Sequence, residues 1–381
     1  MNRDMFLLRP GVTYLNHGSF GACPRPVFEH YQQIQRDIEA QPVEFLGREY
    51  YDRLAEARGA LARFLGAGAD DLIFVANATT GLNIVARSLN LQPGDEILST
   101  DHEYGALDRT WRFFSTKTGA RYIRQPIPLP LSNPQEIIDA VWSGKTDRTK
   151  VLFLSHITSP TALIFPVAEL VRRGREAGLI TIIDGAHVPG QMGLDLTALG
   201  ADFYSGNCHK WMMAPKGAAF LHARPEVQHL VEPLVVSWGY ESLEPGPSEF
   251  IDHQEWTGTR DPSAWLTVPK AIEFLFSHNW EAERERCHRM ICGVHQQITE
   301  LTGQEPICPV SSEWFRQMAA LPLPPGTDIN ALKIDLYDQF QIEIPILELG
   351  GRCYIRPSAQ GYNQPEDFDH LVRGLGQLLG T

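Results

Sequence analysis

Long hydrophobic runs are missing from the sequence. No stretch approaches the roughly 18 consecutive apolar residues of a membrane-spanning helix, and the N-terminal MNRDMFLLRPG has too short an apolar core for a secretory signal peptide. Cysteine is sparse as well, because the six cysteines form no CxxC pair and no dense framework. This spacing predicts reduced thiols rather than disulfides. We therefore expect a cytoplasmic protein that does not bind membranes.

Basic residues are also fewer than acidic residues. The sequence has 33 Lys and Arg against 46 Asp and Glu, which gives a formal net charge of −13 at pH 7. An excess of negative charge disfavours nucleic acid and anionic membranes as partners. The 43% hydrophobic and 21% charged content is typical of a folded globular protein. Because 381 residues exceed what one hydrophobic core usually serves, we expect two domains.

One group of potential metal ligands needs an interpretation. His288, Cys292 and His295 would share one face of a helix in a charged stretch. Structural zinc sites usually take four ligands, and no fourth is evident. We interpret the group as the half-buried face of an ordinary helix and predict no metal site.

Short apolar runs alternate with amphipathic stretches over the first two thirds of the chain. Strands are predicted at residues 72–77, 95–100, 151–157 and 179–184, and helices at 55–65, 81–91, around 111 and at 167–177. Strands that are apolar on both faces and separated by helices indicate a mostly parallel sheet covered on each side.

This alternation is lost between Leu234 and Pro262, where Gly, Pro, Trp and Glu are frequent. Irregular segments of that length inside compact domains are usually functional. A helical pattern resumes at residues 265–301, and a terminal helix is predicted at 365–379. We predict an N-terminal arm (1–25), a large domain (26–262) and a small C-terminal α/β domain (263–381).

Three features carry candidate chemistry. The strand before residue 76 runs into Ala76-Asn77-Ala78-Thr79-Thr80-Gly81 and a helix, whose free amide groups could bind a phosphate, although Thr is also a common helix cap. Asp184 ends a buried strand and needs a cation or strong donors there, unless it only caps the following turn. Lys210, between His209 and Trp211, would have a lowered pKa and a nucleophilic amine if it is desolvated, although a single lysine is more often solvated.

Together these features are the three attachments that pyridoxal phosphate needs: an anion cradle, a partner for its pyridinium nitrogen and a Schiff-base amine. At this point the sequence resembles the class V aminotransferase family of fold-type I pyridoxal-phosphate enzymes, and within it the isopenicillin N epimerase-like group. The motifs that carry the resemblance span the chain in order: YLNHGSFG (14–21), ANATTGLN (76–83), DHEYGALDRTW (101–111), HITSPTAL (156–163), DGAHVPGQ (184–191), DFYSGNCHKW (202–211), WTGTRD (256–261) and YIRPSAQGYN (354–363).

The resemblance implies a large domain with a mostly parallel, seven-stranded sheet, plus a smaller C-terminal α/β domain. It implies that Lys210 carries the Schiff base and then moves the α-proton, and that Asp184 keeps the pyridine nitrogen protonated. The phosphate-binding residues that it implies are Thr79, the amides of Ala78 and Thr80, His209 and Asn207.

Further roles also follow from the resemblance. Tyr104 is expected to stack on the cofactor ring, and His187 to lie near the cofactor hydroxyl unless it is a structural histidine. Arg356 is expected to grip a substrate carboxylate. The remaining expected substrate-binding residues are Asn16, His17 and Ser159. Gly258 and Thr259 match a loop that reaches the phosphate of the neighbouring subunit, which predicts a homodimer.

The implied function is an enzyme that acts at the α-carbon of an amino acid, with epimerisation as the family's label. Epimerisation needs proton transfer on both faces, for which we expect Lys210 on one face and Tyr104, or a water that it holds, on the other. The alternative is a cysteine or cystine C–S lyase that uses the same Lys210 and Asp184. A ligand sensor would lack the lysine or carry a DNA-binding segment. A persulfide-forming desulfurase is disfavoured, because QFQIEIPILELGGR (339–352) contains no cysteine and Cys353 is too close to Arg356.

Overall fold

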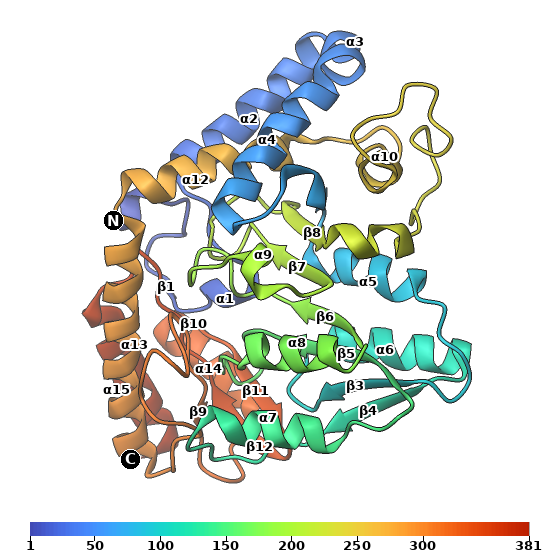
Figure 1. Ribbon diagram of the computed structural model, residues 1–381. Coiled ribbons are helices and arrows are strands. Elements are labelled where there is room, and N and C mark those ends of the chain that lie inside the picture. Colours follow the sequence, from blue (N-terminus) through green and yellow to red (C-terminus); the bar gives the residue numbers. More distant parts are fainter. Residues whose placement is uncertain (381) are drawn as a thin grey trace.

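The computed structural model describes residues 1–380 and is built around a seven-stranded sheet (Figure 1). The strand order is β2-β8-β7-β6-β5-β3-β4, and only β8 runs antiparallel to its neighbours. The strands are β2 (Leu72–Val75), β3 (Glu96–Thr100), β4 (Arg121–Gln125), β5 (Thr149–Ser155), β6 (Ile180–Asp184), β7 (Phe203–Asn207) and β8 (Ala219–Ala223). The predicted mostly parallel, seven-stranded α/β sheet is confirmed.

Helices cover both faces of this sheet, because its central strands are apolar on both sides. Along β5, Val151 and Phe153 join one core, whereas Leu152 and Leu154 point into the other. The first core is completed by α5 (Ala78–Ser88) and α6 (Gly105–Thr118), and the second by α7 (Pro134–Ser143), α8 (Val167–Glu176) and α4 (Tyr50–Leu65). Such two-sided burial explains why these strands lack polar alternation.

The C-terminal third forms a second layer, drawn in orange and red in Figure 1. Helix α13 (Trp280–Thr302) packs along α15 (Pro365–Leu379), and α14 (Ile329–Phe340) lies against β11 (Ile346–Leu349). Strand β11 pairs with β12 (Arg352–Ile355), which pairs with β9 (Leu321–Pro322). The N-terminal segment joins this layer, since β1 (Thr13–Tyr14) pairs with β10 (Ile342–Glu343).

A long helical arm extends from the sheet at the top of Figure 1. It consists of α2 (Arg25–Ala40), the one-turn α3 (Pro42–Glu44) and the start of α4. Helix α11 (Ser263–Leu266) and helix α12 (Val268–Ser277) pack against α2 and α4. Residues 263–277 therefore contact the arm, and the proposed domain boundaries at residues 25 and 262 stay a prediction.

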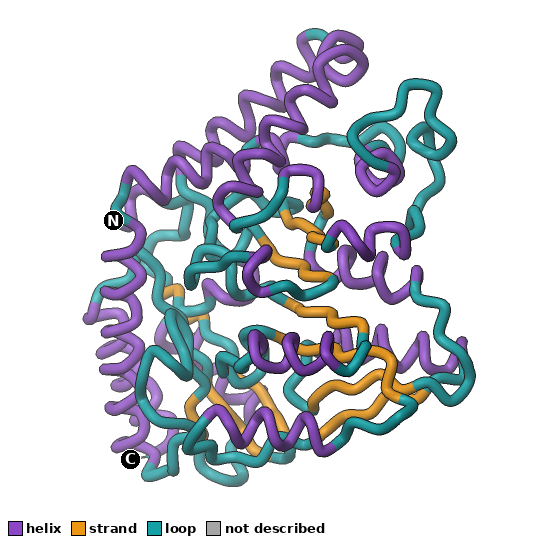
Figure 2. The backbone as a smooth tube through the Cα atoms, viewed as in Figure 1, coloured by secondary structure: helices purple, strands orange, loops and turns teal. Residues whose placement is uncertain are grey.

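The structure refines several element predictions. The terminal helix has the predicted bounds, 365–379. The first helix after β2 begins at Ala78 rather than at 81, because the Asn77 side chain caps it. The helical pattern at 265–301 is divided into α11, α12 and α13, and the break before α13 falls at Asn279, whose φ of 47° is left-handed. The irregular segment 234–262 contains one helix, α10 (Glu249–Glu255), at the end of the protruding loop in Figure 2.

In the described part of the chain, no helix combines the length and apolar character that crossing a membrane requires.

Candidate active site

The carboxyl ends of the sheet strands surround a cavity of about 660 Å³. Open α/β sheets place their ligands at this edge, because the loops and helix N-termini that follow the strands diverge there. The cavity is lined by the end of β5 (Ser155), the end of β6 (Asp184), the end of β7 (Asn207) and the loop after β2 (Asn77), together with Lys210. Residues separated in the sequence by more than 130 positions therefore share one site.

The first turn of α5 is held by two asparagines. The Asn77 side chain accepts from the Thr80 amide at 2.8 Å, and Asn207 Oδ1 accepts from the Ala78 amide at 2.9 Å. We expected both amides to bind phosphate, but in this structure each has a side-chain acceptor. Of the first three amides of α5, only that of Thr79 has no acceptor within residues 1–380. One free amide at a helix N-terminus still favours an anion.

His209 borders the same end of the cavity. Its Nδ1 lies 3.0 Å from the Ala218 carbonyl oxygen, so Nδ1 carries the donated proton. Burial lowers the pKa of His209 to about 4, and Nε2 is bare in the neutral ring. Nε2 can donate to a phosphate only when the ring is protonated, which a bound anion would favour.

Asp184 is buried and lacks a strong partner. Its Oδ1 accepts from the Ala186 amide at 2.9 Å, and within residues 1–380 no Lys, Arg or His nitrogen lies within 4 Å of the carboxylate. Burial raises the pKa of Asp184 to about 6, although the Lys210 charge acts in the opposite direction. A buried carboxylate with one hydrogen bond is suited to a ligand that carries an N–H⁺ group.

Lys210 is half-buried and lines the cavity beside His187. Its Nζ lies 3.2 Å from His187 Nε2, and the Trp211 indole N–H donates to His187 Nδ1 at 3.3 Å. Burial lowers the pKa of Lys210, the Asp184 charge raises it and the Arg356 charge lowers it, with a net value of about 7. The desolvated lysine expected from its neighbours is therefore present in the structure.

Asn16 and His17 do not line the cavity. His17 is fully buried, and its Nε2 donates to the Lys210 carbonyl at 3.0 Å while Nδ1 contacts the Tyr362 hydroxyl at 3.1 Å. Asn16 donates to Glu343 at 3.2 Å. We predicted that both bind substrate. In the structure, His17 links the N-terminal segment to the backbone of Lys210, and Asn16 links it to the Glu343 side chain on β10.

Ser159, Tyr104 and Arg356 occupy the substrate side. Ser159 and Tyr104 line the cavity, and the Tyr104 side chain is 44% exposed. Arg356 is buried, and one guanidinium nitrogen donates to the Ser159 carbonyl oxygen. Burial lowers the pKa of Arg356 to about 10. The same nitrogen lies 3.4 Å from the Ser159 hydroxyl oxygen, and within residues 1–380 the other guanidinium nitrogens have no protein acceptor, so the guanidinium retains donors for a carboxylate.

Two predicted features lie away from the cavity. Gly258 and Thr259 are not among its lining residues, and Thr259 is exposed. On α13, Cys292 Sγ lies 3.5 Å from His288 Nε2, but His295 stacks on Phe315. Among residues 1–380, no three His, Cys, Asp or Glu side chains are arranged to hold a metal ion.

The structure adds cavity residues that sequence reasoning missed. Lys216 lines the cavity and donates to the Gly21 carbonyl at 2.9 Å. Behind Ser155, the buried Glu103 accepts from the Ser155 hydroxyl at 2.6 Å and from Thr100 at 2.7 Å. Burial raises the pKa of Glu103 to about 7. The HEY motif was the available signal for Glu103, and the turn sequence APKG was the signal for Lys216.

The donor set fits pyridoxal phosphate, because the cavity holds a desolvated amine, an unpaired buried carboxylate and a helix N-terminus with a free amide. Comparison with known proteins agrees. Residues 13–371 match the Aminotransferase class-V family.

Similar proteins cover nearly the whole chain. An isopenicillin N epimerase of Amycolatopsis lactamdurans is 36% identical over 99% of this chain and 97% of that protein. A probable chloroplastic L-cysteine desulfhydrase of Arabidopsis thaliana is 30% identical over 97% of this chain and 83% of that protein. The cystine C–S lyase C-DES, solved with glycine covalently linked to its pyridoxal phosphate cofactor, superposes with a TM-score of 0.83 at 22% identity, covering 99% of both chains.

Proposed function

Because this chain belongs to the class-V aminotransferase family, we propose that it is an amino-acid epimerase that removes and returns the proton at the α-carbon of its substrate. The cofactor is pyridoxal phosphate. When bound, this group supplies an electron sink that stabilises negative charge at the α-carbon of an attached amino acid. The two relatives that are each 36% identical over 99% of the chain are both named isopenicillin N epimerases, which favours this reaction.

The observation that carries the proposal is that Lys210 and Asp184 share one buried cavity. Burial lowers the pKa of Lys210 to about 7, so much of its amine is neutral near neutral pH and can accept a proton. Asp184, which is itself buried, offers a carboxylate to a protonated ring nitrogen. Arg356 would orient the substrate carboxylate through its remaining N–H groups.

Tyr104 is our proposed proton donor for the second face. It lines the same cavity as Lys210 and projects from the residue before α6, partly exposed. We predict that Tyr104→Phe stops inversion but leaves α-proton exchange on the Lys210 face, because the ring is kept and only the hydroxyl is lost. Chiral chromatography of amino acids recovered from deuterium oxide measures both events. Normal inversion by the variant would reject this assignment.

The test of the reaction itself is an incubation of the holoenzyme in deuterium oxide with isopenicillin N, the compound in the relatives' names, and with L-alanine. Epimerisation predicts deuterium at the α-carbon together with the opposite configuration. Deuterium uptake without inversion, or no uptake by any amino acid, would count against an epimerase.

A C–S lyase is the second candidate. It is favoured by the relatives named L-cysteine desulfhydrase, at up to 31% identity, and by the likeness to C-DES. The same Lys210 and Asp184 would serve, with expulsion of a sulfur leaving group after proton removal. Offering L-cystine and L-cysteine and assaying pyruvate and sulfide separates the two reactions, since an epimerase releases neither.

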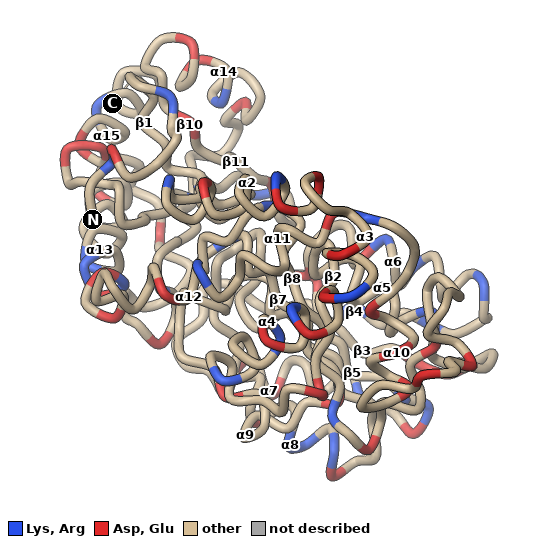
Figure 3. Tube along the Cα trace, turned by 90° about the horizontal axis from the view of Figure 1, so that it is seen from above, with Lys and Arg blue, Asp and Glu red and all other residues tan. Residues whose placement is uncertain are grey.

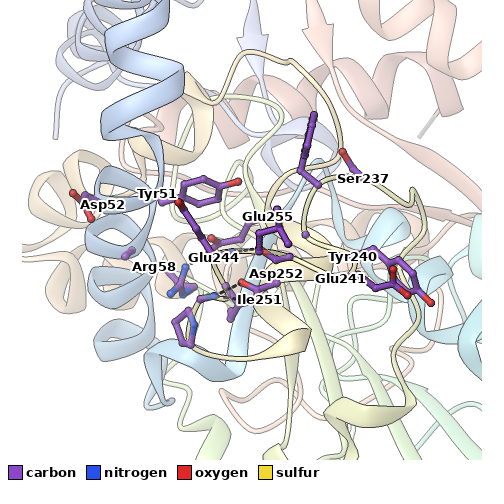
Figure 4. A pocket seen from close by; sticks show the side chains of 17 residues that line it. Tyr51, Asp52, Arg58, Ser237, Tyr240, Glu241, Glu244, Ile251, Asp252 and Glu255 are labelled. Carbon is purple, nitrogen blue, oxygen red and sulfur yellow. Dashed lines mark hydrogen bonds and ion pairs between the residues drawn. The ribbon is translucent and has the colours of Figure 1, made fainter.

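We further propose that the chain acts as a homodimer. Segment 234–243 holds a concentration of exposed apolar side chains, with Trp238 82% and Leu243 99% exposed. The segment borders a cavity of about 990 Å³ that Tyr51 and Arg58 of α4 help to form (Figure 4). Exposed apolar patches of this kind mark protein contacts. Thr259, which is exposed in the following loop, would then reach the cavity of the partner.

A further inference from the structure

The buried hydrogen bond between Trp211 and His187 determines which nitrogen of His187 carries a proton. Trp211 Nε1 lies 3.3 Å from His187 Nδ1. An indole N–H can only donate, so Nδ1 must be the acceptor and must be bare. A neutral imidazole has one proton, which therefore resides on Nε2. From the sequence, Trp211 was expected only to help desolvate Lys210.

The Nε2–H group of His187 then faces the amine of Lys210. The two nitrogens are 3.2 Å apart, and His187 is among the residues that line the cavity. An N–H donor opposite the amine favours the neutral form of Lys210, whose lone pair can accept, over the ammonium form, which would place two donors against each other.

The charged groups near His187 also oppose its second protonation. Besides burial, Lys210 and Arg356 lower the pKa of His187 well below its ordinary value. Asp184 also lines the cavity, and its charge acts on Lys210. No carboxylate lies within 4 Å of His187 among the residues described. The doubly protonated ring, which could not accept from Trp211, is therefore disfavoured.

The packing around Trp211 holds its indole in place beside His187. Trp211 is fully buried, and its ring packs against His17 with centroids 5.1 Å apart. Gly18 lies over the same contact, since a Cβ added there would be 3.4 Å from the Trp211 ring and 3.7 Å from His187 Cε1. The N-terminal motif thus clamps the indole, while His17 holds the backbone carbonyl of Lys210 from the same side.

We propose that Trp211 is a positioning residue that fixes His187 as an N–H donor toward the Lys210 amine, so that His187 does not act as a general base. This inference concerns the same cavity as the proposed function and rests on it for its catalytic meaning. It leaves Lys210 and Tyr104 as the two groups that exchange protons with the substrate.

The test measures the tautomer directly. Magic-angle-spinning NMR of holoenzyme labelled with ¹³C,¹⁵N-histidine distinguishes bare from protonated ring nitrogens, and His187→Gln identifies the signals of His187 by their disappearance. We expect wild-type His187 to show a bare Nδ1 and a protonated Nε2 from pH 6 to pH 9. A protonated Nδ1 in the wild type would overturn the inference whether or not any variant folds, and whatever reaction the enzyme catalyses.

Trp211→Phe removes the indole N–H and keeps an aromatic ring. We expect Nδ1-protonated His187 to appear in its spectrum, and the acidic limb of the pH profile of α-proton exchange to move to higher pH, because a bare Nε2 can accept from the ammonium form of Lys210. Trp280→Phe, on α13, is the matched control, since it removes another buried indole hydrogen bond, the one that Trp280 donates to the Gly190 carbonyl. It should change neither readout. An unchanged His187 spectrum in Trp211→Phe would also overturn the inference.

Discussion

The amine of Lys210 is subject to opposing influences. Burial and the Arg356 charge disfavour its protonated form, whereas the Asp184 carboxylate favours it. The net result is a pKa of about 7, below the ordinary lysine value, so the neutral fraction rises as the pH increases through 7. Burial, together with the charges of Asp184 and Arg356, thus determines the pH range in which the amine is a nucleophile.

We predict that the rate at which apoprotein combines with pyridoxal phosphate rises with pH and levels off above about pH 8. Asp184→Asn should move this midpoint to lower pH, because loss of the negative charge removes the influence that raises the pKa of Lys210. Stopped-flow absorbance between pH 5 and pH 10 measures both. A wild-type rate that is still rising at pH 10, with no plateau, would mean that Lys210 is solvated and keeps the ordinary lysine pKa.

At the scale of elements, helix α5 begins where a ligand anion would lie. Asn77 Oδ1 accepts from Thr80 N, which fixes the first turn and leaves the Thr79 amide directed to the cavity end of the helix. Helix α7 has the same kind of cap, since Asn133 accepts from Glu136 N, but it lies away from the cavity. The two helices therefore form a natural pair for comparison.

Asn77→Ala and Asn133→Ala should each lower the free energy of unfolding by about 1 kcal/mol, the usual effect of losing an N-cap. Only Asn77→Ala should also weaken pyridoxal phosphate binding, because only there does the frayed turn belong to the cavity. Urea unfolding and absorbance titration with the cofactor provide the two measurements. Equal cofactor affinities in the two variants would show that the N-terminus of α5 does not contribute to binding the cofactor.

Local signals predicted four of the seven strands of the large sheet, β2, β3, β5 and β6, whereas the seven-stranded sheet as a whole was implied by the family resemblance. Asp184 could be placed because it ends a continuous apolar strand, and strand ends meet at one edge of a parallel sheet. Lys210 follows FYSGN, which is not an apolar run, so its assignment depended on its neighbours His209 and Trp211 and on the family resemblance. The engagement of the Ala78 amide by Asn207 could not be predicted, since it joins residues 129 positions apart. His17 was assigned to the substrate for the same reason: its contacts to Tyr362 and Lys210 exist only in the folded chain.

On the scale of the whole molecule, the N-terminal segment is joined to the C-terminal layer. Strand β1 pairs with β10, and Leu15 accepts from Ser358 through its backbone carbonyl. Residues of both charges are interspersed along the chain in Figure 3. The exposed apolar side chains are distributed differently, because six of them fall within segment 234–243.

That concentration predicts how the molecule associates. Apolar side chains at the core of a subunit contact lose their water when the contact forms, so replacing them weakens association without changing the fold of one chain. Trp238→Ser with Leu243→Ser should convert a dimer into monomers in analytical ultracentrifugation, with an unchanged circular dichroism spectrum. Ile334→Ser, which alters an exposed apolar residue on α14, is the control and should leave the dimer intact. If the double variant sediments as the wild type does, segment 234–243 is not the contact, and Thr259 then has no route to a neighbouring cavity through this face.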